Sequence, residues 1–323
     1  MSPDSRRLRI LTWHVHGNYL WYLTQVPHEF FLVTDPSRSA HHTGRSGTLP
    51  WGDNVHEAPA EKVRDMPFDL VLYQSRAEYE RAGELLSPAQ RRLPAIYLEH
   101  DPPLENPTDQ RHWADDGHAT IVHVTGFNAL MWDHRESPVE VVEHGVRLLT
   151  EARYDGHLAQ GLTVVNNLGT RGRRLGPDVF DTVRRHVPLT LVGMGSLALG
   201  GHGEVSNRDL PPFMAPDRFF FNPIRYTSLG LSVIEAMQVG LPILGLATTE
   251  MPTVIVNGVN GWLDTRPGRL IEVARQLLDD PALARQWGDA ARRTARERFG
   301  IDRFVADWCR VLDRRVDSAG HSG

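Results

Sequence analysis

The residues best suited to ligand chemistry lie where a polar loop runs into a short helix. Residues 226–230 are polar or small, and the apolar spacing that follows predicts a helix over residues 231–239. The first N–H groups of a helix lack partners and carry partial positive charge, so they bind anions, phosphate above all. Glu235, one turn in, is placed to accept hydrogen bonds from sugar hydroxyls beside that phosphate. The small residues that leave this end open are Ser228, Gly230 and Ser232.

The same segment has a purely structural interpretation. Ser232-x-x-Glu235 fits a capping box, in which the glutamate only satisfies a free N–H of its own helix. In either case the inner face of the helix would carry Leu231, Ile234 and Met237.

A second candidate for phosphate binding is a glycine-rich basic loop. Residues 161–168 form a predicted strand. The loop after it contains Gly169 and three arginines, Arg171, Arg173 and Arg174. Arginine forks match phosphate oxygens, and glycine permits close approach of the backbone. Of the three arginines we favour Arg171 and Arg174 as the phosphate ligands. The alternative is an exposed basic loop without a ligand.

In the N-terminal half, charged residues follow a predicted strand over residues 94–98. Glu99, His100 and Asp101 come directly after it, and two prolines then fix the loop. Such a position at the carboxyl end of a strand is typical of an active-site edge in an α/β domain. The alternative is a His-Asp pair that only shapes a turn.

The first predicted strand, over residues 8–15, is followed by Gly17, which allows a ligand to approach the backbone. The alternative is a glycine that merely ends the strand. At strand spacing His14 and His16 point to one face and could form a ligand pair, but two histidines alone do not specify a metal site.

Two irregular segments could recognise an acceptor. Residues 35–53 lack periodicity and form a predicted loop. Residues 107–118 are polar and could either contact an acceptor or form a solvated helix face. The charged residues of this second segment are Asp109, Arg111, His112, Asp115 and Asp116.

Composition sets the outer bounds. With 323 residues, the chain is long enough for two domains. A formal charge of −5 argues against a general nucleic-acid binder. One cysteine excludes an internal disulfide and indicates a reducing compartment. No apolar run has the length of a membrane span, and no signal peptide is evident, so we expect a cytoplasmic protein.

Residues 222–264 resemble the donor-site signature of the glycosyl transferases group 1 family, whose members are retaining GT-B-fold glycosyltransferases. The match runs without a gap over this stretch, is strong over about 160–310 and is partial over 8–148. The matching residues are Pro223, Tyr226, Gly230, Leu231, Ser232, Glu235, Ala236, Met237, Gly240, Pro242, Pro252, Val254, Gly258, Asn260 and Gly261.

The resemblance implies roles for the residues singled out above. Glu235 would hold the ribose hydroxyls of a nucleotide, and the backbone of residues 230–232, with Leu231, would take the distal phosphate. The arginine loop would grip the diphosphate, and Gly17 would face it. His100, with Asp101 beside it, would meet the donor sugar near the reacting carbon.

This chain departs from the family pattern at the sugar end of the site. Thr227 stands where the family has a glutamate that contacts the donor sugar, and a neutral hydroxyl cannot replace a carboxylate as an acceptor. The family's Gly-Gly before x-Pro-Glu is also missing, with Thr249, Glu250 and Thr253 in that stretch. Nucleotide binding therefore carries over better than sugar identity.

We therefore expect an α/β protein of the GT-B fold, with two Rossmann-like domains whose parallel sheets face one another across a cleft. The first domain covers residues 1–148, the donor-binding domain covers 149–301, and a helix near 302–316 packs back on the first. Independently of the resemblance, strands that alternate with helices indicate parallel α/β domains.

The expected activity is metal-independent, retaining transfer of a sugar from a nucleotide diphosphate sugar to a small-molecule or saccharide acceptor. No cofactor beyond this donor substrate, no metal and no nucleic acid are expected, and peripheral membrane contact and the oligomeric state stay open. Two alternatives are an isomerase similar to the nucleotide-sugar 2-epimerases and a nucleotide-sugar-binding protein without catalysis.

Overall fold

The computed structural model describes residues 6–320, and the chain divides into two compact units. The first unit comprises Met1–Gly145 with Ile301–Gly323, and the second comprises Val146–Gly300. Each unit has its own parallel sheet and its own core, as the alternation of strands and helices predicts.

The first unit is built on a seven-stranded sheet in the order β3-β2-β1-β4-β5-β6-β7, in which every neighbouring pair is parallel. Strands β4 and β5 are buried along their whole length, because a parallel sheet is covered on both faces. The strands are β1 Arg9–Thr12, β2 Glu29–Thr34, β3 Val55–Pro59, β4 Leu70–Tyr73, β5 Ala95–Glu99, β6 Ala119–His123 and β7 Val139–Val141.

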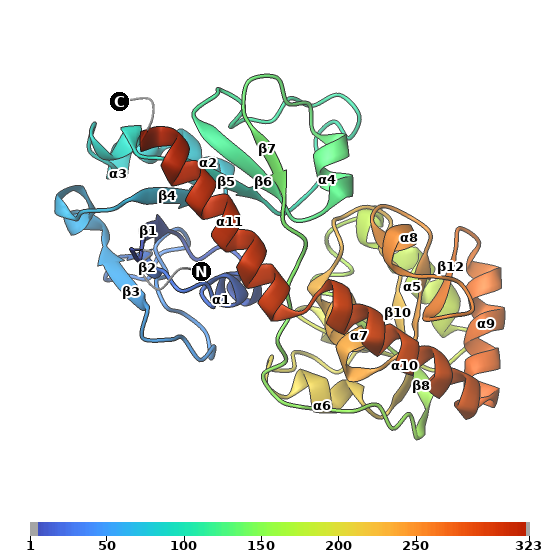
Figure 1. The fold of residues 1–323 in the computed structure, drawn as a ribbon. Helices are drawn as coiled ribbons and strands as arrows, with labels where there is room; N and C mark the ends of the chain where they lie inside the picture. Colours follow the sequence, from blue (N-terminus) through green and yellow to red (C-terminus); the bar gives the residue numbers. More distant parts are fainter. Residues whose placement is uncertain (1–5, 321–323) are drawn as a thin grey trace. The chain divides into compact units, whose positions relative to one another are not determined.

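Short helices and one long helix accompany this sheet (Figure 1). Helix α11 (Ile301–Gly320), red in Figure 1, contacts α1 (Gly17–Leu23): Trp308 is fully buried and donates its indole N–H to the hydroxyl of Tyr19 over 3.2 Å. The others are η1 Ala60–Asp65, α2 Arg76–Glu80, α3 Ala82–Leu85, η2 Gln90–Arg92 and α4 Gly126–Met131.

The second unit is built on a five-stranded sheet in the order β12-β11-β10-β8-β9, again entirely parallel. Its strands are β8 Leu158–Val164, β9 Leu189–Val192, β10 Asp217–Asn222, β11 Ile243–Leu246 and β12 Gly261–Asp264. Its helices are η3 Arg173–Leu175, α5 Pro177–Arg184, η4 Ser196–Leu199, α6 Leu210–Met214, α7 Leu231–Val239, α8 Met251–Val254, α9 Pro267–Asp279 and α10 Pro281–Arg298.

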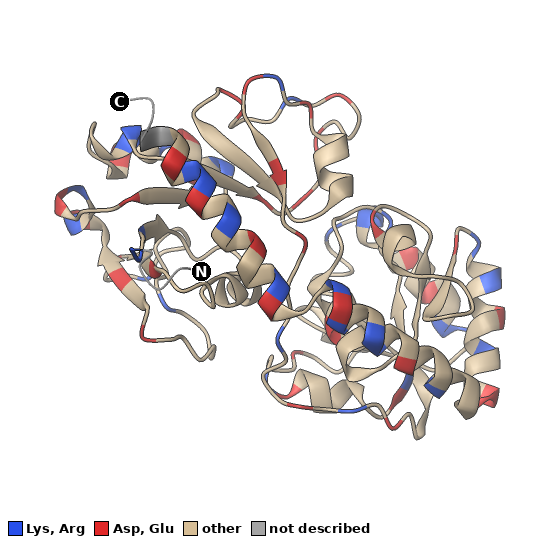
Figure 2. Cartoon of the chain, in the orientation of Figure 1, with Lys and Arg blue, Asp and Glu red and all other residues tan. Residues whose placement is uncertain are grey.

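Acidic and basic side chains are mixed along α11 rather than segregated by sign (Figure 2). Arg303 and Arg310 both pair with Asp307, and Arg314 pairs with Glu140. Within residues 6–320, no helix has both the length and the apolar character needed to cross a membrane.

Candidate functional site

Helix α7 begins at Leu231, and its N-cap residue is Gly230, which makes no side-chain cap hydrogen bond. Ser232 therefore occupies the second helical position and cannot be the N-cap. Its hydroxyl lies 3.3 Å from the carbonyl oxygen of Val164 at the end of β8 and donates to it. The capping box proposed for Ser232 and Glu235 is thus wrong, because the serine serves the neighbouring strand instead of its own helix.

The buried residues of α7 are not confined to one apolar face of the helix. Leu231, expected to point inward, is half-buried, whereas Glu235 is only 8% exposed. The reason is that α7 contacts both the sheet and α10. On the side of α10 the approach is close, since a Cβ on Gly288 would lie 2.0 Å from the carbonyl oxygen of Gly240, the residue that ends α7 in the left-handed conformation.

The loop before α7 is tied to the arginine loop after β8. The N–H groups of Arg225 and Tyr226 donate to the carbonyl oxygen of Arg174 over 2.8 and 3.3 Å. Gly176, with a φ of +76°, passes so near to Pro223 that a Cβ would lie 1.9 Å from its carbonyl oxygen. These contacts bring together the two segments that the sequence proposes as phosphate ligands, and they place Thr227 and Ser228, both half-buried, in the same loop.

The three arginines of that loop differ in exposure and in their ion pairs. Arg173 lies 3.3 Å from the carboxylate of Asp178, which also binds Arg225 through two bonds of 2.6 and 2.7 Å. Arg171 is exposed, and no carboxylate of residues 6–320 forms an ion pair with it. Arg174 is half-buried, and its backbone holds the loop before α7. Arg171 is therefore available to an anion, whereas Arg173 is partly neutralised.

The turn after β9 contains Gly193-x-Gly195, and its backbone comes close to the loop after β8. Gly193 has a φ of +128°, and a Cβ there would lie 2.7 Å from the carbonyl oxygen of Val165. Asn166 accepts a hydrogen bond from the N–H of Met194 over 2.9 Å, and Asn167 takes the left-handed conformation with a φ of +56°. Asparagine is one of the few residues that tolerate this conformation.

In the loop after β11, a residue other than glycine takes the positive φ that usually favours glycine. Thr249, one of the residues that replace the family's Gly-Gly, has a φ of +53°, which costs a β-branched residue about 1–3 kcal/mol. The next residue, Glu250, is 5% exposed, accepts from the hydroxyl of Thr253 over 2.6 Å and lies 3.6 Å from Arg298. Thr248 donates to the carbonyl oxygen of Ile224 and so joins this loop to the one before α7.

In the first unit, His100 lies at the carboxyl end of β5 among side chains from three other segments. Its ring centroid is 4.2 Å from that of His16 and 4.8 Å from that of Tyr19, and its Nε2 lies 3.2 Å from Oε1 of Gln74 at the end of β4. Burial, together with the nearby His16 and His144, holds the pKa of His100 well below its usual range. This environment therefore favours the neutral imidazole.

The backbone around His100 is fixed on both sides. Asn128 donates to the carbonyl oxygen of His100 over 3.2 Å, and Trp132 donates to that of Asp101 over 2.9 Å. The N–H of Asp101 in turn donates to Glu99, a residue 6% exposed whose pKa burial raises to about 8. The Glu99-His100-Asp101 turn is thus built rigidly at the edge where the sequence places chemistry.

The two histidines that follow β1, His14 and His16, make contacts with different parts of the unit. Strand β1 ends at Thr12, so the strand alternation expected to reach residue 15 does not apply. His14 binds the carbonyl oxygen of Gly44 over 2.8 Å and packs against Trp51, whereas His16 packs against His100. The ligand pair considered for His14 and His16 is therefore wrong.

Gly17 begins α1 and lies beside His14. A Cβ at Gly17 would lie 3.0 Å from Nε2 of His14, so the absence of a side chain permits this close approach. Because β1 lies next to β4 and β4 next to β5, Gly17 and His100 share the carboxyl edge of the sheet.

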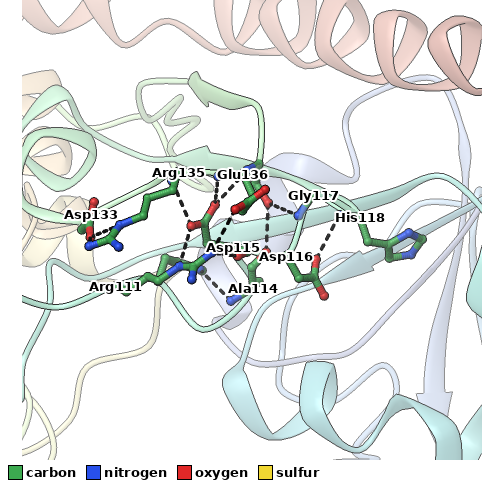
Figure 3. A network of polar contacts seen from close by, with 11 residues as sticks. Arg111, Ala114, Asp115, Asp116, Gly117, His118, Asp133, Arg135 and Glu136 are labelled. Carbon is green, nitrogen blue, oxygen red and sulfur yellow. Dashed lines mark hydrogen bonds and ion pairs between the residues drawn. The ribbon is translucent and has the colours of Figure 1, made fainter.

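The polar segment 107–118 does not form a helix, and one of its carboxylates is enclosed. The side chain of Asp115 is fully buried and accepts from the backbone N–H groups of Arg135, Glu136 and Ser137 and from Arg111 (Figure 3). Burial works against the charge, but these four donors hold the pKa of Asp115 below its usual range. The carboxylate joins two loops, which is a structural role.

Two other polar residues of this segment also have partners within the unit. His112 is buried and lies 3.2 Å from Glu99. Asp116 accepts from the hydroxyl of Tyr79 over 2.9 Å. His112 is therefore enclosed, whereas Asp116 is exposed and stays a candidate for acceptor contact.

A pocket of about 500 Å³ opens beside the carboxyl ends of the first strands of this unit. Trp13, after β1, is one wall, the loop after β2 is a second, and α2 with α3 is a third. Asp35 and the adjacent histidines of the 35–53 loop belong to the lining, as the sequence suggests for an acceptor-binding loop. The polar lining residues are Asp35, Ser39, His41, His42, Glu78, Arg81 and Glu84.

Gln74 was not among the candidates from the sequence, although it joins His100 to β1. It follows an apolar strand directly, and a polar residue at that position of a parallel sheet is the signal that could have identified it.

Comparison with known proteins finds related sequences over part of the chain. Residues 200–294 match the family model described as glycosyl transferases group 1. The D-inositol 3-phosphate glycosyltransferase of Streptomyces avermitilis is 39% identical over 77 residues, 23% of this chain and 16% of that protein. The N-acetyl-alpha-D-glucosaminyl L-malate synthase of Bacillus anthracis is 35% identical over 85 residues, 25% of this chain and 22% of that protein. The chain thus matches about a fifth of the length of these relatives.

Solved structures extend the likeness to the whole chain at the level of fold. A sucrose-phosphate synthase from Thermosynechococcus elongatus superposes with a TM-score of 0.73 over 97% of this chain and 100% of that one, at 14% identity. HepE from Anabaena, solved in complex with UDP and glucose, gives a TM-score of 0.69 over 95% of this chain and 100% of that one, at 13% identity. The predicted GT-B fold, with two parallel-sheet units, is confirmed.

Proposed function

We propose that this chain, whose residues 200–294 belong to the glycosyl transferases group 1 family, is a glycosyltransferase that moves a sugar from a nucleotide diphosphate sugar to an acceptor. The observation that carries the proposal is the N-terminus of α7. Gly230 leaves its N–H groups without a side-chain cap, and the buried carboxylate of Glu235 lies one turn further on. A phosphate at the helix end and a ribose beside Glu235 would use both features.

The leaving diphosphate needs positive charge that is in place before the bond breaks. The end of α7 provides a fixed dipole, and Arg171 provides a cation without an acidic partner within residues 6–320. Fixed charges of this kind stabilise a developing anion without reorganisation. We therefore propose that transfer does not require a metal ion, and that it proceeds with retention, with the leaving phosphate assisting attack by the acceptor.

The acceptor is proposed to bind the pocket of the first unit. Its lining combines an indole face at Trp13 with a carboxylate at Asp35, the groups that recognise the faces and hydroxyls of a saccharide. The only cationic guanidinium of the lining, Arg81, is already paired with Glu84 over 2.7 Å. A neutral polyhydroxyl acceptor suits this lining better than an anionic one.

One observation favours a second candidate, a nucleotide-sugar-binding protein without catalysis. Thr227 replaces a carboxylate at the sugar end of the site, and Thr249 is held in a strained conformation in the loop joined to it. Both changes weaken the case for strong contacts to the donor sugar more than the case for nucleotide binding.

A donor panel tests these proposals. The chain is incubated in EDTA with UDP-, GDP-, ADP- and dTDP-sugars, UDP-glucose first because HepE was solved with UDP and glucose, and free nucleoside diphosphate and sugar products are quantified. Release of one nucleoside diphosphate, increased by saccharide acceptors and lost in Glu235→Ala, is the expected result. A new nucleotide sugar formed without acceptor would identify an isomerase, and binding without any turnover would identify a binding protein.

A further inference from the structure

Gln74 lies at the carboxyl end of β4, the strand between β1 and β5, and its side chain bridges these two neighbours. It is 4% exposed. Its Nε2 lies 2.7 Å from the carbonyl oxygen of Trp13 and 3.1 Å from the hydroxyl of Thr12. A carbonyl oxygen can only accept, so the amide atom that faces Trp13 must be the NH2 group. The orientation of the Gln74 amide is therefore fixed by chemistry.

This orientation determines where His100 carries its proton. The remaining amide atom, Oε1 of Gln74, lies 3.2 Å from Nε2 of His100 and can only accept. A neutral imidazole has one N–H, so that N–H is at Nε2 and the lone pair is at Nδ1. Nδ1 makes no hydrogen bond to any residue that the structure describes.

The imidazole ring is also held in place. The rings of His16 and Tyr19 contact it, the latter edge-on with an interplanar angle of 88°. The backbone of His100 is held by Asn128. A fixed ring with one defined lone pair presents an acceptor to a hydroxyl, whereas it would repel the oxygens of a phosphate or carboxylate.

We propose that Gln74 is a positioning residue that holds His100 as the Nε2–H tautomer and thereby presents Nδ1 as a hydrogen-bond acceptor to a substrate hydroxyl. The tautomer follows from the first unit alone, and only the identification of the hydroxyl as that of a sugar substrate rests on the proposed function.

The tautomer is measured directly by ¹⁵N NMR of the full chain, in which protonated and unprotonated ring nitrogens give distinct signals. His100→Asn assigns the resonances. Gln74→Met keeps the approximate size of the side chain and removes the acceptor. Gln74→Glu, protonated at the oxygen that faces the Trp13 carbonyl so that it still donates there, keeps an acceptor towards His100. Gln90→Met is the matched control, because Gln90 is also buried and its amide donates to the carbonyl oxygens of Val63 and Met66, away from His100.

The expected result is a single Nε2–H tautomer in the wild type, in Gln74→Glu and in Gln90→Met, and exchange between both tautomers in Gln74→Met. A wild-type His100 protonated at Nδ1, or a Gln74→Met variant whose tautomer is unchanged, would overturn the proposal. These outcomes do not depend on the chain being a transferase.

The contact between Nδ1 of His100 and a substrate hydroxyl is tested by turnover with the donor that the panel identifies. Gln74→Met should lower kcat/KM by roughly tenfold, the scale of one lost hydrogen bond, while Gln90→Met retains it and Gln74→Glu recovers part of it. Equal losses in Gln74→Met and Gln90→Met would show that Gln74 acts only through stability and would contradict its positioning role. If the chain has no turnover but shows the expected tautomers, the proposed function fails and the assignment of Gln74 stands.

Discussion

Two Ser-x-x-Glu segments start helices in this chain, one in each unit. In the first unit, the hydroxyl of Ser75 accepts from the N–H of Glu78 over 3.4 Å, and the Glu78 carboxylate accepts from the N–H of Gln74 over 3.3 Å. Together these bonds cap the helix, with the glutamate reaching back to the residue before the N-cap. In the second unit, Ser232 donates instead to the end of β8, and the buried Glu235 lies on a helix whose N-cap has no side-chain partner.

The difference comes from what precedes each serine. Ser75 follows β4 after one residue and is itself extended, so it is the last residue before the helix. Before Ser232, Gly230 takes the extended conformation and Leu231 has already begun the helix. The spacing of serine and glutamate therefore does not identify a cap. One segment uses its polar groups to cap a helix, and the other leaves the helix end without a side-chain cap, where we propose that a ligand binds.

The largest expected effect is the pH dependence of the capping glutamate. Burial raises the pKa of Glu78 to about 7 from 4.5. Between these values the folded chain keeps a proton that the unfolded chain has lost, so the free energy of unfolding falls as pH rises through this window, by up to about 3 kcal/mol.

Glu78→Gln should remove this contribution, and denaturant titrations at pH 5 to 8 measure it. Glu99, whose pKa burial raises to about 8, titrates in both proteins, so the difference between them isolates Glu78. Identical slopes for the two proteins would contradict the account of a buried capping carboxylate.

Glu78 and Glu235 should also differ in their effect on nucleotide binding. Glu235→Ala should weaken nucleotide binding by roughly 10- to 30-fold, as loss of charge-assisted hydrogen bonds to ribose predicts. Glu78→Ala should leave the affinity unchanged and lower the free energy of unfolding by about 1 kcal/mol. Calorimetric titration with a nucleoside diphosphate measures the first effect and denaturation the second. Wild-type affinity in Glu235→Ala would remove the ligand role from the second segment.

The serines give a smaller contrast. Ser75→Ala removes an N-cap and should cost about 1 kcal/mol of stability. Ser232→Ala removes one hydrogen bond of 3.3 Å to Val164 and caps nothing, so its cost should stay below about 0.5 kcal/mol. Both costs are measured by chemical denaturation. Equal costs for the two variants would mean that Ser232 does cap its helix in solution.

The smallest effect concerns Thr249, in the loop after β11 that is joined to the loop before α7. Thr249→Gly relieves a positive φ of +53° but makes the unfolded chain more flexible, so stability should rise by only about 0.5 kcal/mol. Thr248→Gly, the adjacent control, removes a hydrogen bond to Ile224 and should lower the melting temperature. If Thr249→Gly lowers it as well, the left-handed conformation carries no strain.

Much of the fold could be predicted because the spacing of apolar residues and the positions of glycine and proline indicate the same element boundaries. Helix α7 has the bounds that its apolar spacing and Gly240 indicate, and the apolar β4 and β5 follow the same logic. Strand β3 was missed, because its alternating burial on a polar sequence gives little apolar signal. Strand β1 is shorter than predicted, since an apolar run continues past its last ladder hydrogen bond.

The site was less predictable, because its contacts depend on tertiary structure. No local pattern distinguishes Arg171 from Arg173, whose partner Asp178 is also bound by Arg225, distant in sequence. Nor does composition show that Asp115 is a buried link between two loops and not an acceptor contact.

The central claim is that the open end of α7 binds the phosphates of a nucleotide. The most direct measurement is the thermal stabilisation of the chain, in EDTA, by uridine, UMP and UDP, with ADP, GDP and dTDP alongside. Stabilisation that increases steeply with the number of phosphates for one base, and falls in Glu235→Ala, is the predicted result. Equal stabilisation by nucleoside and diphosphate, or none by any of them, would contradict the claim.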